Sequence, residues 1–177
     1  MFWPSFNAAL APLETQRQRT IINTLLSISV SCFASYGLSR AFHTKFGIAE
    51  IQNATLAGGV GIGAAADMML EPFGAMLVGL IAGSLSVAGF AHIGPFLENK
   101  LNFHDTAGIH NLHGMPGVLG GIASIIACAV ATPAIYQESL YYIFPMRAPK
   151  NETLVPPGEG FSAGEQAFHQ LLALLIK

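Results

Sequence analysis

Long apolar segments alternate with short polar connections along this chain of 177 residues. About 20 apolar residues are enough for a helix to cross the hydrocarbon layer of a membrane. Four segments of about that length or longer contain no Asp, Glu, Lys or Arg: residues 20–39, 51–66, 72–97 and 106–137. The pattern therefore predicts an all-α membrane protein, built as a polytopic helical bundle.

Extending these segments to their polar ends gives four complete helices, and a shorter apolar segment lies at each end of the chain. The expected helices are 1–11 (partial), 20–42, 50–68, 72–97, 105–132 and 165–177 (partial), all in one domain spanning 1–177. The partial helices indicate a fragment or a truncated gene model. Residues 133–164 are rich in proline and are expected to form an extramembrane loop.

Orientation in the membrane depends on this loop. It contains the sequon Asn151-Glu-Thr153, so Asn151 is a glycosylation candidate and would place the loop outside. The lysines and arginines of the connections do not favour either orientation. A second sequon begins at Asn53 inside an apolar helix, where we expect a buried packing or hydrogen-bonding residue instead.

Composition agrees with a membrane protein. Hydrophobic residues make up 52% of the chain and charged residues 10%, against about 25% charged residues in soluble domains. The net charge of −2 and the lack of a basic cluster give no reason to expect nucleic acid. Asp67 and Glu71 flank a tight turn between two helices and are expected to be solvated or to cap.

Small residues recur at four-residue spacing in the apolar segments. Such rows allow helix backbones to approach closely in lipid, where packing holds helices together. The rows are Ser27, Ser31, Ser35 and Ser39; Gly59 and Gly63; Gly79 and Gly83; and Gly117 and Gly121. They predict a compact bundle but do not identify what it transports.

The run DTAGIHNLHGMPG at 105–117 places two imidazoles at the start of an apolar helix. An ionisable side chain inside a membrane indicates a functional site. His110 and His113 are three residues apart and would share roughly one helical face. Pro116 cannot donate a hydrogen bond to the carbonyl of Leu112, which favours a kink beside His113. The alternative is a histidine satisfied by interhelical hydrogen bonds.

If His113 lines a pore with apolar walls, the neutral ring is favoured, and a neutral imidazole both donates and accepts a hydrogen bond. This suits a small solute such as ammonia or water. Asp105 has two interpretations, an N-cap or an electrostatic aid to a cation. A metal cluster of His104, Asp105, His110 and His113 is disfavoured because one helix spreads these residues over two turns.

Five runs of the chain are informative together: FWPSFN at 2–7, IQNATLAGGV at 51–60, MMLEPFGA at 68–75, PFLENKL at 95–101 and DTAGIHNLHGMPG at 105–117. With these runs the chain resembles the Rh glycoprotein branch of the ammonium transporter (Amt/Rh) family. The resemblance implies the second inverted repeat of an Amt/Rh channel fold. It also implies a multi-pass protein of the plasma membrane and a homotrimer with one pore per subunit.

The same resemblance assigns roles to individual residues. His113 matches the second histidine of the family's twin-histidine pair, Asp105 matches the acidic residue before it, and Phe6 matches one of two stacked phenylalanines that gate the outer vestibule. His110, Asn53 and Pro116 are expected to be supporting residues. The partner histidine and the other phenylalanine have no counterpart in this chain.

These expectations favour passage of ammonia or ammonium, with carbon dioxide as a further candidate solute, and no enzymatic activity, cofactor or metal. Because the expected pore is shared between two repeats, the chain by itself is not expected to conduct. Two alternatives stay open. One is a truncated, non-transporting subunit that packs with full-length relatives, and the other is a metal-ion transporter with ligands on several helices.

Overall fold

The computed structural model describes residues 2–42, 48–150 and 158–176, and these ranges are mostly helical, without a strand. Two helical turns have π geometry (η1 and η2) and two have 3-10 geometry (η3 and η4). The elements in order are α1 Trp3–Asn7, α2 Glu14–Phe42, α3 Ile48–Gly63, α4 Pro72–Ala88, η1 Gly89–Ile93, α5 Gly94–Leu101, η2 His110–Gly114, α6 Met115–Ala129, α7 Pro133–Tyr136, η3 Gln137–Ser139, α8 Leu140–Ile143, η4 Pro145–Arg147 and α9 Ala163–Ile176.

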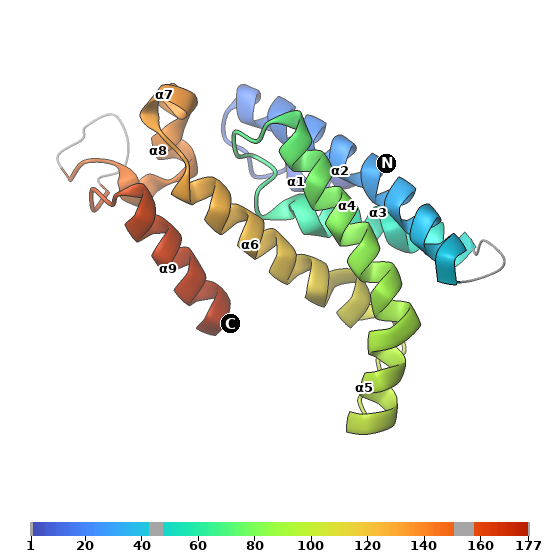
Figure 1. Ribbon diagram of the computed structural model, residues 1–177. Helices are drawn as coiled ribbons and strands as arrows, with labels where there is room; N and C mark the ends of the chain where they lie inside the picture. Colours follow the sequence, from blue (N-terminus) through green and yellow to red (C-terminus); the bar gives the residue numbers. More distant parts are fainter. Residues whose placement is uncertain (1, 43–47, 151–157, 177) are drawn as a thin grey trace.

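The long helices form a bundle in which α2 packs against both α3 and α4 (Figure 1). α3 also contacts α6, and α9 runs alongside α6, on the side of α6 that faces away from α2 and α4. α4, η1 and α5 follow one another as a single bent column, and α5 projects beyond the rest of the bundle. The π turn η1 lies between α4 and α5 in this column, and the π turn η2 directly precedes α6.

The polarity of α2 is reversed relative to a helix of a soluble protein. Its polar and small side chains face the bundle, whereas apolar side chains such as Ile22 and Phe33 are exposed. This arrangement suits a helix whose outer surface meets lipid. The buried polar residues are Gln16, Thr20, Asn23, Thr24, Ser27, Ser31, Ser35 and Ser39.

Hydrogen bonds between helices satisfy several of these buried hydroxyls. Ser27 donates to the carbonyl of Gly58 at 2.8 Å, and Ser31 donates to the carbonyl of Ala54 at 2.7 Å. On the other side of α2, a Cβ added to Gly79 would collide with the carbonyl of Ser27. The predicted close approach of helices through small residues is therefore confirmed along α2.

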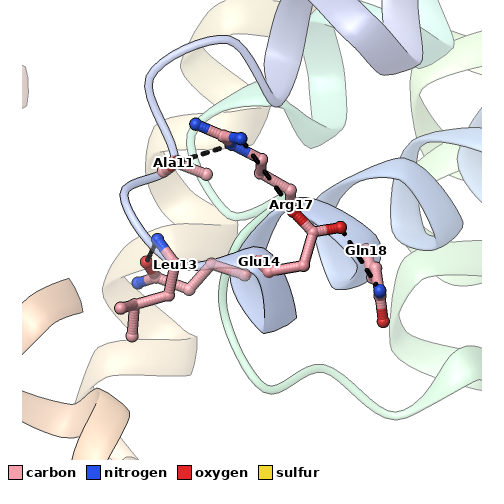
Figure 2. A network of polar contacts seen from close by, with 6 residues as sticks. Ala11, Leu13, Glu14, Arg17 and Gln18 are labelled. Atoms are coloured by element: carbon pink, nitrogen blue, oxygen red, sulfur yellow. Dashed lines mark hydrogen bonds and ion pairs between the residues drawn. The ribbon is translucent and has the colours of Figure 1, made fainter.

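The first turn of α2 explains why this helix begins six residues before the expected position. Gln16 reaches back, and its Oε1 accepts from the Leu13 N–H at 3.2 Å, which satisfies one of the free donors of the helix start. Arg17 Nε donates to the carbonyl of Ala11 at 3.0 Å, and Gln18 Nε2 donates to Glu14 Oε1 at 3.3 Å (Figure 2). A polar first turn thus precedes the apolar segment.

Within the described ranges, three helical stretches are long and apolar enough to cross a membrane: Glu14–Phe42, Pro72–Leu101 and His110–Ala129. α3 has 16 residues and ends at Gly63, five residues before its expected end. At 1.5 Å per residue it rises roughly 24 Å, less than the ~30 Å of the hydrocarbon layer. The third stretch starts at His110, five residues after the expected helix start.

The segment expected to be a loop at 133–164 contains the short helices α7 and α8, the two 3-10 turns and the first residues of α9. Tyr136, Leu140 and Phe144 are buried against α6 and the connection between α3 and α4. Residues 158–162 return to this unit, since the N–H groups of Glu159 and Phe161 donate to the carbonyl of Met146. Asn151 lies outside the described residues, so its glycosylation remains a prediction.

Candidate pore-lining site

Both histidines of the 105–117 run lie on the π turn η2. The N–H of Met115 donates to the carbonyl of His110, five residues back, instead of the α-helical four. Pro116, which has no N–H, is buried as the second residue of α6. The sequence predicted a kink beside Pro116, and the structure has a widened turn directly before it. Such π turns frequently occur at functional sites.

The widened turn gives the two histidines different neighbours. The ring centroid of His113 lies 6.4 Å from that of Trp3, and its side chain is exposed. His110 is partly buried, with its ring 6.2 Å from Phe103 in an edge-to-face arrangement. The expectation that both imidazoles share one face is therefore not met, because the extra residue of the π turn increases their angular separation.

Asp105 fixes the start of this turn. Its carboxylate accepts from the N–H of Ile109 at 2.9 Å and from the N–H of His110 at 2.7 Å. These are donors that the beginning of a helix leaves without intrahelical partners. The carboxylate satisfies donors of the helix start, but from four residues before the N-cap residue Ile109 rather than from the N-cap position itself. It places a negative charge at the positive end of the helix dipole. An electrostatic effect on a solute remains a proposal.

Trp3, at the start of α1, is the aromatic neighbour of His113. The sequence analysis did not single out Trp3. A Cβ added to Gly59 would lie 2.6 Å from the Trp3 ring, so the indole occupies space that only glycine leaves free. Asn7 anchors the same short helix by donating to the carbonyl of Gly59 at 3.1 Å and to Thr24 Oγ1 at 3.2 Å. The one tryptophan of the chain and the glycine pair at 58–59 were the available signals.

Phe6 stands beside Trp3, edge to face, with the ring centroids 5.4 Å apart. It is 71% exposed, and with Phe2 and Trp3 it lines an apolar pocket of about 230 Å³. The structure thus brings Phe6, Trp3 and His113 together as a row of rings. Gating of a vestibule by Phe6 stays a prediction.

His110 lines a larger, mostly apolar cavity of about 460 Å³ between α4 and α6. Leu85 contributes from α4, and the remaining lining comes from η2 and α6: Gly114, Met115, Val118, Leu119 and Ile122. His110 is the polar side chain in this lining. It lies at the edge of an apolar space, whereas His113 belongs to the row of rings.

The other candidate residues lie away from these rings. Asn53 is half-buried on α3, where a buried side chain was expected. The ring nitrogens of His104 lie 3.2 Å from Glu98 Oε1 and 3.1 Å from Asn102 Oδ1. Among the described residues, no group of three or more His, Cys, Asp or Glu side chains could hold a metal ion.

Asp67 is partly buried, although a solvated or capping side chain was expected. Burial raises the pKa of its carboxyl, and a backbone hydrogen bond and the charge of Arg19 offset this only in part. Arg19 Nε donates to the backbone carbonyl of Asp67 at 2.8 Å, and the Tyr136 hydroxyl accepts from the Met69 N–H at 3.1 Å. Side chains of α2 and α7 thus bind the connection between α3 and α4 through hydrogen bonds to its backbone.

Comparison with known proteins places this arrangement in a family. Residues 1–176 match the model of the Ammonium Transporter Family. Ammonium transporter Rh type B of Takifugu rubripes is 48% identical over 147 residues, which are 82% of this chain and 32% of that protein. Ammonium transporter Rh type B-B of Xenopus laevis is 42% identical over 178 residues, or 99% of this chain and 37% of that protein.

Solved structures of the same family are also similar to this chain. The structure of Nitrosomonas europaea Rh50, described as one of the Rhesus protein family of channels, matches with a TM-score of 0.68 and 38% identity, covering 99% of this chain and 41% of that one. A sensor Amt protein shares the fold, with a TM-score of 0.66 at 22% identity. This chain spans about a third of the length of the curated relatives. It belongs to the ammonium transporter family and is a multi-pass helical membrane protein of the Amt/Rh fold.

Proposed function

We propose that this chain contributes one side of a transmembrane path for ammonia or ammonium, and that the ring of His113 contacts the solute. The observation that carries the proposal is the exposed imidazole of His113, set in a π turn at the start of an apolar helix and flanked by Trp3. A polar side chain in that position is costly unless it meets protein or a hydrated path. The relatives named as ammonium transporters support the choice of solute.

The chemistry of the ring fits this solute. A neutral imidazole presents one donor and one acceptor, and ammonia needs both. The neighbouring surfaces are apolar rings, which give a small solute few competing hydrogen bonds. Asp105 would hold the histidine turn in place through its capping bonds, while Phe6 would stand at the outer end of the row.

The proposed path is incomplete in this chain alone. His113 and Phe6 are both exposed, and the chain matches only 32–37% of the length of the relatives. We propose that a second histidine-bearing segment, such as the longer relatives have room for, covers this face. Assembly into a homotrimer, passage of carbon dioxide and a plasma-membrane location belong to the same proposal.

The test replaces the matching segment of Nitrosomonas europaea Rh50 with this chain and measures methylammonium uptake into vesicles. Uptake above that of empty vesicles is expected for the chimera. A correctly inserted chimera without uptake would contradict a transport role and favour the alternative, a membrane subunit that packs with longer relatives without conducting. Metal-dependent flux that is lost on changing both His110 and His113 would instead indicate a metal-ion transporter.

A further inference from the structure

The two π turns of the molecule share a pattern and lie against each other. In η1, the N–H of Gly94 donates to the carbonyl of Gly89, and Pro95 follows. In η2, the N–H of Met115 donates to the carbonyl of His110, and Pro116 follows. Each turn therefore places a five-residue-back hydrogen bond directly before a proline.

Asn111 fills the space between these turns. It belongs to η2, and its side chain is 97% buried, with 3% of its surface exposed. A Cβ added to Gly89 would lie 2.6 Å from Asn111 Oδ1, and one added to Gly94 would lie 3.3 Å from Asn111 Nδ2. Because Gly89 and Gly94 have no side chains, the amide of Asn111 fits into the space beside them.

Packing alone does not explain an amide at this place. Asn111 Oδ1 is buried and has no hydrogen-bond partner among the described residues. An unsatisfied buried acceptor is unfavourable, and an apolar side chain of similar shape would avoid it. Such groups in native structures call for an explanation other than stability.

The location of Asn111 offers an explanation for its buried amide. It lies two residues before His113 in the same widened turn, so the fit of its amide against η1 fixes the rotation of that turn. We propose that Asn111 is a positioning residue, which orients the imidazole of His113 by locking η2 onto η1. This rests on the proposed role of His113 in contacting the solute, although the orientation itself can be measured without transport.

Trp3 provides the readout, because it is the one tryptophan of the chain and its ring lies 6.4 Å from His113. A protonated imidazole close to an indole quenches its fluorescence. The experiment records Trp3 emission against pH for the full 177-residue chain in detergent micelles. His113→Gln should remove the pH-dependent quenching, and His110→Gln should retain it, which assigns the signal to His113.

In this assay Asn111→Ala should lose most of the quenching amplitude. Gly89→Ala should do the same from the opposite side of the contact. Its methyl group would meet both the flexible end of Met115, which can move aside, and the buried amide of Asn111, which it would displace. The double variant should recover towards the wild-type curve, since the added methyl occupies the space that the amide left. Gly37→Ala, where a Cβ meets nothing within 4 Å, is the matched control and should have no effect.

Circular dichroism identifies variants that fail to fold. If Gly89→Ala is one of them, Gly94→Ala provides the milder contact of 3.3 Å and should produce a smaller loss of quenching amplitude. Wild-type quenching curves in folded Asn111→Ala and Gly94→Ala would overturn the positioning role. A lack of transport in the chimera, with the fluorescence effects intact, would instead count against the proposed function alone.

Discussion

At the residue scale, Asp105 links the loop after α5 to the histidine turn. Its two oxygens accept from consecutive N–H groups, those of Ile109 and His110, so one side chain satisfies two of the donors at the helix start. The cap therefore sets where the π turn begins. His113 lies three residues after the second of these residues, His110, in the same π turn, so Asp105 supports the turn that carries His113.

Replacing Asp105 by Ala should destabilise this turn by about 1 kcal/mol, within the range of roughly 0.5–2 kcal/mol known for lost N-caps. Asp105→Asn keeps one oxygen acceptor and should lose less. Hydrogen exchange of the Ile109 and His110 amides measures the effect locally. Unchanged protection of both amides in Asp105→Ala would show that the carboxylate does not cap the turn in solution.

At the element scale, close crossings of α2 hold the bundle together. Gly79 and Gly83 of α4 lie directly against the backbone of Ser27 and Ser31, so α4 cannot accept a larger residue there without moving. These crossings follow from the small-residue rows and could be predicted from the sequence. The π turns could not, because a single five-residue-back bond leaves the apolar pattern of an α-helix almost unchanged.

Gly79→Ala should therefore cost about 1–3 kcal/mol, the usual penalty of overpacking. Gly74→Ala is the matched control on the same helix, because its Cβ would lie an ordinary 3.8 Å from the nearest atom, Leu70 Cβ. Thermal unfolding in detergent compares the two variants. Equal stability of both would mean that α2 and α4 do not approach as closely as described.

The connection between α3 and α4 gives a pH-dependent prediction. Because burial raises the pKa of Asp67, its ionised form is disfavoured in the folded state. The wild type therefore has the full contribution of neutral Asp67 below the unfolded pKa of about 3.9 and loses it as pH rises through the higher folded value.

Asp67→Asn does not ionise, so its stability relative to the wild type should increase as pH rises above about 4, to a plateau above the folded pKa of Asp67. Melting temperatures measured across this range, in the same detergent, show the trend. A stability difference that stays constant with pH, or decreases as pH rises, would contradict a raised pKa for Asp67.

At the scale of the whole molecule, the sequence predicted the membrane class and three of the four expected spanning segments, whereas the roles of His113, Phe6 and Asp105 stay predictions. It could not predict that Trp3 lies against His113, because this contact joins residues far apart in the chain and depends on the space at Gly59. Nor could it show that the proline-rich segment after α6 folds into short helices. Those helices are stabilised by packing on α6 rather than by a periodic pattern of their own.

The exposed row of rings has a consequence for the isolated chain. One side of a path gives a solute no continuous enclosure, so this 177-residue chain reconstituted by itself should take up no more methylammonium than empty vesicles do. Uptake by the chain alone, above that control, would show that copies of this chain complete a path without a further segment.

The role of His113 is the central claim, and one comparison tests it most directly. In the chimera with the Rh50 protein, methylammonium uptake is measured for His113→Ala and for His169→Ala, which removes an exposed imidazole of α9 that stacks on Phe161. We predict at least a roughly tenfold loss of uptake for His113→Ala, or about 1.4 kcal/mol in the barrier, and wild-type uptake for His169→Ala. Equal uptake and unchanged selectivity in both variants, at equal amounts of inserted protein, would contradict the account.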